Sequence, residues 1–275
     1  KNKYYSRSYT LKGERKINIS DELSFGFGSD YNYNKGDFDV KGSWGSSARG
    51  HSDNLGIFTN FGYKFNNNTV FSSHLRGDKH KYSQENITYR LNLTKLISNF
   101  TLSLSESTGL RHPDLYVLHG KNPSGSFKSM ATTKPETSLT RELSLKYNFF
   151  KDVSFQTTAY KGTISDVLNR GTATNGYNEI IDIKQEGLEN SLVFKDNFQK
   201  FTLSNTFSKS REGDGTPQLR RPEKQFGIKY SRKFISNFAG PFDLNYDYRH
   251  VGKVEDWKNG SVRAKVDSSD IMNLS

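Results

Sequence analysis

Arginine, histidine and aromatic side chains recur in four segments rich in Gly, Asn, Ser, Thr and Pro, and they are the side chains best suited to recognising a ligand. Guanidinium groups bind anions through paired hydrogen bonds, and aromatic faces stack on planar groups. The combination predicts a large planar or anionic ligand. The candidates are Trp44 and Arg49 in Lys35–Asp53, Arg111, His112, Tyr116 and His119 in Gly109–Thr137, Arg170 and Tyr177 in Gly162–Tyr177, and Arg211 and Arg220 in Lys209–Arg221.

The sequence lacks the patterns that carry common enzyme chemistry. It contains no Gly-x-Ser-x-Gly nucleophile elbow, no phosphate-binding glycine loop and no pair of histidines at zinc-binding helical spacing. Cysteine is absent, which excludes thiolate metal sites, cysteine nucleophiles and a disulfide framework. We therefore expect neither enzyme activity, nor a metal site, nor a cofactor.

Alternating strands must position the candidate segments. Apolar residues at 143, 145, 147 and 149 alternate with polar residues at 142, 144, 146 and 148, which is the period of a strand with one apolar face. Short turns are expected at Asn66–Asn68, Ile97–Asn99, Phe149–Asp152 and Asp196–Gln199, and longer polar loops at Lys35–Asp53 and Gly77–Ser83. We expect about thirteen strands, with a bulge at Gly187 and a final strand from about Gly260.

The composition fits a membrane-spanning sheet. Of 275 residues only 32% are hydrophobic and the mean hydropathy is −0.80, yet 20 Phe and 15 Tyr are present, which argues against disorder. A barrel needs apolar residues on one face only, in strands of about 9–11 residues. The predicted fold is an all-β, antiparallel transmembrane β-barrel. Phenylalanines near the short turns predict an interfacial girdle, formed by Phe65, Phe100, Phe149, Phe150, Phe198, Phe201, Phe234, Phe238 and Phe242.

The net charge of +11 raises the question of an anionic partner. Basic residues are dispersed among acidic ones, and no nucleic-acid-binding motif is present, so we expect no nucleic-acid partner. Attraction to anionic lipid head groups, or to an anionic ligand, is the more natural use of this charge.

Several motifs in chain order resemble the barrel of TonB-dependent outer-membrane receptors. Gly109–Tyr116 (GLRHPDLY), the Asn122-Pro123 pair and Lys134–Ser138 (KPETS) are similar to successive elements in the middle of that barrel. Glu142–Tyr147 and Gln185–Glu189 resemble strands that follow, and Leu219–Pro222 (LRRP) resembles a strand entry of the cobalamin-receptor branch. Leu110 departs from the usual Phe, and residues 130–133 depart from the usual Asn-Pro-x-Leu spacing.

The resemblance implies energised uptake of a scarce, large nutrient through a barrel of about 22 strands. Residues 1–275 are then expected to be a single partial barrel domain that lacks the plug domain and the C-terminal strands, leaving about nine strands absent. The implied setting is the outer membrane of a Gram-negative bacterium. The implied partners are outer-membrane lipid and the TonB energy-transducing protein, reached through a missing N-terminal segment, and the complete barrel is expected to be monomeric.

The identity of the ligand stays open between two classes. Leu219–Pro222 favours a corrinoid such as cobalamin, and a ferric siderophore is the second candidate. A passive porin or an adhesin-type barrel is the alternative function, because alternating strands alone do not reveal energy coupling.

Overall fold

The structure, a computed structural model, describes residues 2–40, 46–121, 134–169, 179–236, 240–258 and 262–275. Long strands dominate these ranges. In chain order the elements are β1 (Lys3–Asn18), β2 (Leu23–Val40), β3 (Ser46–Asn66), β4 (Thr69–His80), β5 (Asn86–Ile97), β6 (Phe100–Arg111), α1 (Leu115–His119), β7 (Gly120–Lys121), β8 (Glu136–Phe150), β9 (Val153–Asn169), β10 (Glu179–Lys195), β11 (Gln199–Glu212), β12 (Lys224–Ser236), β13 (Gly240–Val251), β14 (Val254–Lys258), β15 (Val262–Val266) and β16 (Ser269–Leu274).

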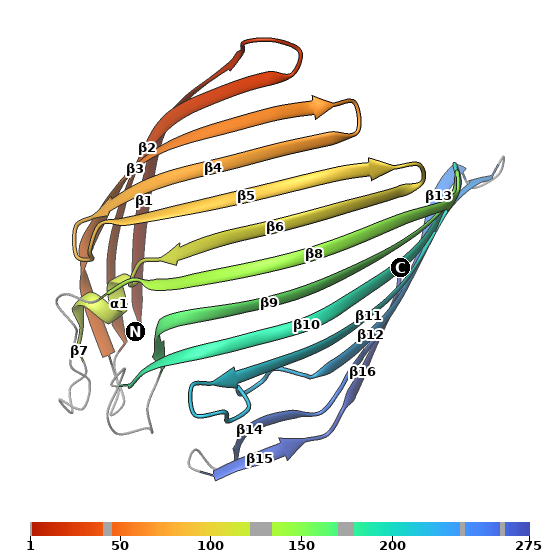
Figure 1. The fold of residues 1–275 in the computed structure, drawn as a ribbon. Coiled ribbons are helices and arrows are strands. Elements are labelled where there is room, and N and C mark those ends of the chain that lie inside the picture. The colour runs from red at the N-terminus through yellow and green to blue at the C-terminus, as the bar shows by residue number, and fades with distance from the viewer. Residues whose placement is uncertain (1, 41–45, 122–133, 170–178, 237–239, 259–261) are drawn as a thin grey trace. The chain divides into compact units, whose positions relative to one another are not determined.

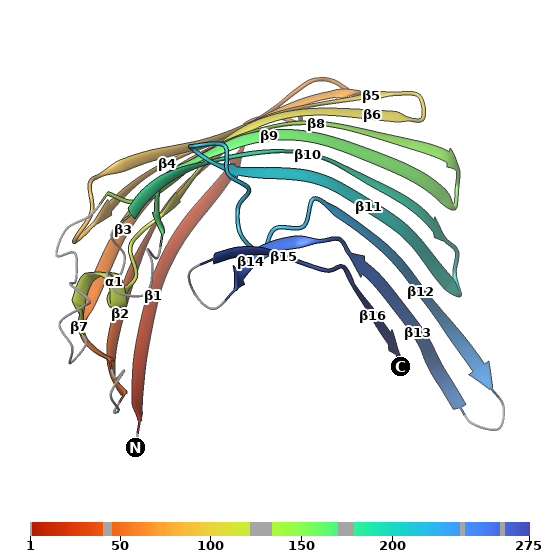
Figure 2. The same cartoon turned by 90° about the horizontal axis from the view of Figure 1, so that it is seen from below.

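The main sheet follows the order β1-β2-β3-β4-β5-β6-β8-β9-β10-β11-β12-β13-β16, with β7 paired to β3 (Figures 1 and 2). Thirteen strands lie on this path, which confirms the predicted number. Neighbouring strands pair in antiparallel register wherever their registers are described. Within the described ranges the path has two free edges, β1 and β16, so the barrel is not closed. No described helix has the length and apolar character needed to cross a membrane.

The chain divides into two compact units. The first unit comprises Lys1–Leu93, Glu106–Leu139 and Thr163–Asp182, and the second comprises Thr94–Ser105, Thr140–Gly162 and Ile183–Ser275.

The sheet of the first unit has one apolar and one polar face. Large exposed apolar side chains occupy odd positions of β1–β5, namely Tyr9, Leu11, Phe25, Phe27, Tyr31, Leu55, Ile57, Phe61, Tyr63, Phe65, Leu75, Ile87, Leu91 and Leu93. Even positions carry polar groups, such as Asp30, Arg76 and Asp78, and also the buried Phe58. We call these the apolar face and the polar face. The small buried core of this unit includes Ala48, Phe58, Val117 and Leu118.

The second unit shows the same alternation. Leu203 lies opposite Ile228, which lies opposite Tyr248, whereas Lys229 lies opposite Asp247 on the other face. Hydrogen bonds connect Ser144 with Gln156 and Thr158, so polar side chains of neighbouring strands share a face as the alternation predicts. Leu143 and Leu145 are exposed. A strand period of two therefore organises the sheet of each unit.

Two of the expected loops are largely occupied by strands. Most of Lys35–Asp53 belongs to β2 and β3, which continue pairing from Lys35 opposite His51 to Val40 opposite Ser46. Likewise β4 runs to His80, into the segment expected to be a loop. In Lys35–Val40 the apolar residues Phe38 and Val40 lie at even positions, unlike the odd apolar positions earlier in β2, and Gly77–His80 carries polar residues on both faces. Backbone pairing therefore continues the strands beyond the point where the apolar alternation of the odd positions ends.

The short turns are confirmed at Asn66–Asn68, Ile97–Asn99, Phe149–Asp152 and Asp196–Gln199, each lying at the junction of two consecutive strands. The expected bulge at Gly187 is wrong for the pairing of β10 with β11, which passes in register through Gly187 opposite Ser208. The strand expected from about Gly260 corresponds to β15, but β15 pairs with β14 in a separate hairpin, and β16 then returns to pair with β13.

Candidate functional site

A short helix follows β6 in the first unit and packs on the sheet. Asp114 caps α1, because its side chain accepts a hydrogen bond of 2.8 Å from the backbone N–H of Val117. Val117 and Leu118 are buried with 4% and 2% of their surfaces exposed, and β7 directly after the helix pairs with β3. The cap and the two apolar side chains therefore fix the segment that carries Arg111, His112, Tyr116 and His119. Figure 2 shows the short helix α1 beside β3.

Histidines and tyrosines hold this segment against the sheet. The imidazole rings of His80 and His112 stack with centroids 4.3 Å apart and planes inclined by 11°, and Nδ1 of His112 lies 2.9 Å from Oγ of Ser83. His119 meets Tyr82 edge to face, with ring centroids 5.2 Å apart. The ring of His119 occupies the space above Gly50, where a Cβ atom would collide with it. A residue larger than glycine at position 50 would therefore displace His119.

His112 is held in its neutral form. Burial lowers the pKa of His112 to about 4, and the neighbouring His80 acts in the same direction. Nε2 of His112 and Nε2 of His119 are both buried, and neither has a hydrogen-bond partner among the described residues. A buried imidazole nitrogen without a partner can donate to or accept from a bound molecule.

A cavity of about 700 Å³ lies between the helical segment and the ends of β1 and β2. Its lining combines aromatic rings, imidazoles and small polar groups. The lining residues are Tyr4, Tyr5, Ser6, Asn34, Gly36, Asp37, Phe38, Ser52, His80, His112, Pro113, Asp114, Leu115 and Tyr116. The rings of Phe38 and Tyr116 lie 5.3 Å apart. The volume of the cavity lies in the range of small-molecule sites, and its lining combines aromatic rings with polar side chains such as Asn34, Asp37, Ser52 and Asp114.

An arginine clamp lies on the polar face close to the cavity. The guanidinium of Arg76 donates to Asp30 at 2.5 and 3.0 Å and to Asp78 at 2.8 and 2.7 Å. Asn54 also donates to Asp78, at 2.7 Å. The guanidinium occupies the space above Gly56, where a Cβ atom would collide with it. Because both carboxylates are engaged, this clamp stiffens the sheet beside the cavity.

The other predicted residues of this unit lie outside the cavity lining. Arg111 donates to Glu136 at 3.2 Å and remains 72% exposed, so its guanidinium is accessible at the entry to the helical segment. Arg49 forms an ion pair of 3.5 Å with Asp37. His119 lies on the polar face above Gly50, and successive side chains of a strand point to opposite faces. The side chain of the neighbouring Arg49 therefore lies on the apolar face. The structure thus brings His112, Tyr116 and His119 together but separates Arg49 from them.

Predicted residues of the second unit form their own cluster. Arg211 donates to Glu223 at 2.8 Å. Arg220 adopts a positive φ of 60°, donates from its backbone N–H to the carbonyl of Glu255 at 2.8 Å and from Nε to Asp256 at 2.9 Å. The segment of Arg220 is therefore fastened to the β14–β15 hairpin.

Arg263 completes this fastening, although the sequence pattern did not single it out. Its guanidinium donates to the carbonyl of Pro217 at 2.6 Å and to Glu212 at 2.9 Å, and it lies 5.5 Å above the ring of Trp257. The arginines of this cluster thus hold two loops together. Trp44, Arg170 and Tyr177 lie outside the described residues.

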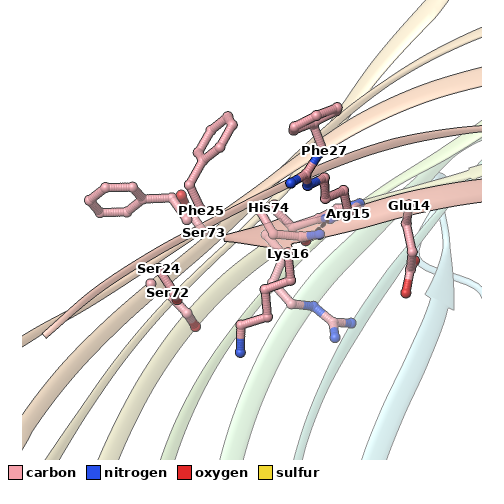
Figure 3. A pocket seen from close by; sticks show the side chains of 14 residues that line it. Glu14, Arg15, Lys16, Ser24, Phe25, Phe27, Ser72, Ser73 and His74 are labelled. Atoms are coloured by element: carbon pink, nitrogen blue, oxygen red, sulfur yellow. Dashed lines mark hydrogen bonds between the residues drawn. The ribbon is translucent and has the colours of Figure 1, made fainter. Parts of the chain in front are cut away.

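A second hollow, of about 410 Å³, lies nearer the short turns of the first unit. Figure 3 shows Glu14 and Lys16 on the side of the strands opposite the rings of Phe25 and Phe27. Among the described residues, none of the predicted binding residues lines this hollow. Its lining combines serines, His74 and charged side chains of the polar face with Phe25, Phe27 and Phe61 of the apolar face.

Sequence reasoning missed several residues that line the 700 Å³ cavity. Phe38, Ser52 and His80 fall in segments that were expected to be loops, and Tyr4 lies near the start of the chain. All four residues lie at even positions of the sequence. Phe38 and Ser52 thus lie on the polar face of β2 and β3, beyond the stretch in which the odd positions are apolar. Extending that parity along the chain would have found them.

The described strands form the antiparallel sheet of a partial transmembrane barrel, and comparison with known families gives the same class. The family described as TonB dependent receptor-like, beta-barrel matches residues 1–275. The chain belongs to this family, whose members are transport receptors. No curated protein matches the chain.

Solved structures share the fold at low sequence identity. The FrpB iron transporter from Neisseria meningitidis (F3-3 variant) is 13% identical with a TM-score of 0.71, over 98% of this chain and 48% of that chain. The siderophore receptor PirA from Acinetobacter baumannii is 17% identical with a TM-score of 0.72, over 98% and 48%. A mutant of the ferric enterobactin receptor PfeA from Pseudomonas aeruginosa is 17% identical with a TM-score of 0.74, over 98% and 46%. The chain spans about half the length of these structures.

Proposed function

We propose that this chain forms part of the barrel of an outer-membrane receptor that takes up a scarce, large nutrient with energy from the TonB system. The family match over residues 1–275 is the observation that carries the proposal. We further propose that the plug domain and the remaining strands lie outside this chain, since the chain spans about half of its structural neighbours. The partners would be outer-membrane lipid and the TonB protein, in a Gram-negative bacterium.

A ferric chelate is our first candidate for the ligand. The titles of the structural neighbours name an iron transporter, a siderophore receptor and a ferric enterobactin receptor. The aromatic rings that line the 700 Å³ cavity can stack on the planar rings of a chelator, and the exposed guanidinium of Arg111, at the entry to the helical segment, can pair with its negative charge.

A corrinoid becomes the second candidate. The case for it rests on Leu219–Pro222, but Arg220 within that motif is engaged with Glu255 and Asp256 of the β14–β15 hairpin. The motif thus has a role in loop packing that requires no particular ligand.

Binding to the purified full-length protein tests both proposals. Ferric enterobactin and cyanocobalamin would each be titrated, with quenching of intrinsic fluorescence as the measurement. Replacing Arg111 and Tyr116 by Ala should weaken binding of the preferred ligand roughly ten- to a hundred-fold, because a charge-assisted hydrogen bond contributes about 1.5–3 kcal/mol.

A matched control replaces one basic and one aromatic residue at a short turn, Lys151 and Phe150, and should leave the affinity unchanged. Tighter binding of cyanocobalamin than of the chelate would reverse our order of ligands. Equal affinities of the double variant and the wild type would show that the α1 segment takes no part in binding.

A further inference from the structure

A row of basic side chains crosses four segments of the first unit on the apolar face. Arg7 of β1 lies opposite Lys35 of β2, which lies opposite His51 of β3. Lys81, directly after β4, extends the row, because its Nζ lies 2.6 Å from Nε2 of His51. Arg7, Lys35 and Lys81 are exposed.

This basic row lies just beyond the apolar part of the same face. On β3 the apolar positions run from Leu55 to Phe65 beside the short turn, which matches the 9–11 residues that a barrel strand needs to cross a bilayer. His51 lies about 13 Å further along the strand, or about 9 Å further along the membrane normal at the usual tilt. Such a distance places the row at the level of lipid head groups.

Aromatic rings lie between the apolar part of this face and the basic row. Tyr9 lies opposite Tyr33, with ring centroids 6.3 Å apart, and the ring of Tyr33 stacks on His51 at 5.6 Å. Tyrosines are enriched at membrane interfaces, where an apolar ring and a polar hydroxyl are both accommodated. The sequence of apolar residues, tyrosines and then cations follows the polarity profile of one bilayer leaflet.

Acidic groups nearby leave the centre of the row positive. Asp37 lies beyond the row and forms an ion pair with Arg49 at 3.5 Å. Asp53 lies at the level of the tyrosines, opposite Tyr33. The three cations Arg7, Lys35 and Lys81 have no acidic ion-pair partner within the described ranges. They therefore remain available to an anion.

We propose that Arg7, Lys35 and Lys81 bind the phosphate groups of membrane-lipid head groups that surround the barrel. Ammonium and guanidinium groups form strong charge-assisted hydrogen bonds with phosphate oxygens. A lipid suits the site better than a free anion because its acyl chains contact Leu11, Tyr31 and Leu55 while its phosphate meets the row. The inference rests on the proposed membrane location but not on the identity of the transported nutrient.

Lipid binding to the purified full-length protein in detergent tests the inference, with phosphatidic acid as the probe and native mass spectrometry as the readout. The test variant replaces Arg7, Lys35 and Lys81 by Ser. A control variant replaces one arginine and two lysines on the polar face of the same unit, Arg90, Lys12 and Lys16, and so loses the same charge.

The test variant should bind phosphatidic acid about a hundred-fold more weakly than the wild type, because each basic residue near an anionic head group contributes about five-fold. The control variant should bind like the wild type. Equal weakening in both variants would show that only the net charge of the protein matters, and it would overturn the proposed lipid site. Displacement of the lipid by an equal concentration of inorganic phosphate would also overturn it, because the acyl chains would then contribute nothing.

Reconstitution separates this inference from the proposed function. Failure of the wild-type protein to enter lipid nanodiscs would refute the membrane location on which both depend. Reconstitution of all three proteins with identical phosphatidic acid binding would refute the lipid site alone.

Discussion

Replacing Arg76 by Met should destabilise the protein strongly, because the substitution leaves two carboxylates without their cation. Arg76 makes four hydrogen bonds to Asp30 and Asp78. The side chains of the two carboxylates are only 11% and 5% exposed, and that of Arg76 is 23% exposed. Methionine keeps the aliphatic stem, so the loss falls on the charge and its hydrogen bonds.

The expected magnitude follows from this burial. Removing one partner of a buried ion pair costs about 3–5 kcal/mol, mainly because the remaining charge stays desolvated. Lys79 on the same strand provides the matched control: its pair with Glu85 has 73% and 72% of the two side chains exposed. Lys79→Met should therefore cost at most about 1 kcal/mol. Combining Arg76→Met with Asp30→Asn and Asp78→Asn should recover part of the loss, because no charge then remains unpaired.

Urea titration of the full-length protein in lipid, followed by tryptophan fluorescence, gives the free energy of unfolding of each variant. The reasoning requires a difference of at least about 2 kcal/mol between the two single variants. Similar values for Arg76→Met and Lys79→Met would show that the clamp is hydrated and contributes no more than a surface pair.

Three further predictions concern the membrane, the helical segment and the open sheet. Leu145→Arg should cost about 2–4 kcal/mol in unfolding titrations in lipid, whereas Ser144→Arg on the other face should cost little; equal costs would exclude a membrane barrel wall. Lowering the pH from 6.5 towards 4 should loosen α1, because His112 must stay neutral to remain packed and its pKa of about 4 lies below the ordinary value. The protection factor of the Val117 amide, which compares its exchange rate with the unprotected rate at the same pH, should fall over that range in the wild type but not in His112→Phe. Identical profiles would exclude His112 as the cause of the loosening. The isolated 275-residue chain should fail to insert into bilayers as a heat-resistant monomer, because β1 and β16 are open edges; successful insertion, seen by gel mobility before and after heating, would contradict the open sheet.

The fold was largely predictable because a strand's period of two is a local signal. Alternation from Glu142 to Phe149 predicted β8 and its apolar face, and short runs such as Asn66–Asn68 predicted the turns. The ends of β2 and β3 were missed for a physical reason. Their pairing from Lys35 to Val40 depends on backbone hydrogen bonds, and the apolar residues there, Phe38 and Val40, lie at even positions, so the alternation that marks the odd positions earlier in β2 does not continue.

The candidate site was predictable only in part. The Gly109–Thr137 segment was singled out by its concentration of Arg, His and Tyr, and the structure brings His112, Tyr116 and His119 together there, while their part in ligand binding stays a prediction. Helix α1 was missed because its five residues are too few to show a helical period, although Asp114 is a good capping residue. The stacking of His80 on His112 joins residues far apart in the chain, so no local pattern could reveal it.

The central claim, energised uptake, is tested most directly by transport into intact cells. Cells with and without the full-length gene would be supplied with radioactive iron as ferric enterobactin, in the presence and absence of an uncoupler of the proton gradient. Our account predicts that accumulation requires both the gene and the gradient, and that it saturates with chelate concentration. Gene-dependent accumulation that is unaffected by the uncoupler and does not saturate would contradict the account and identify a passive pore.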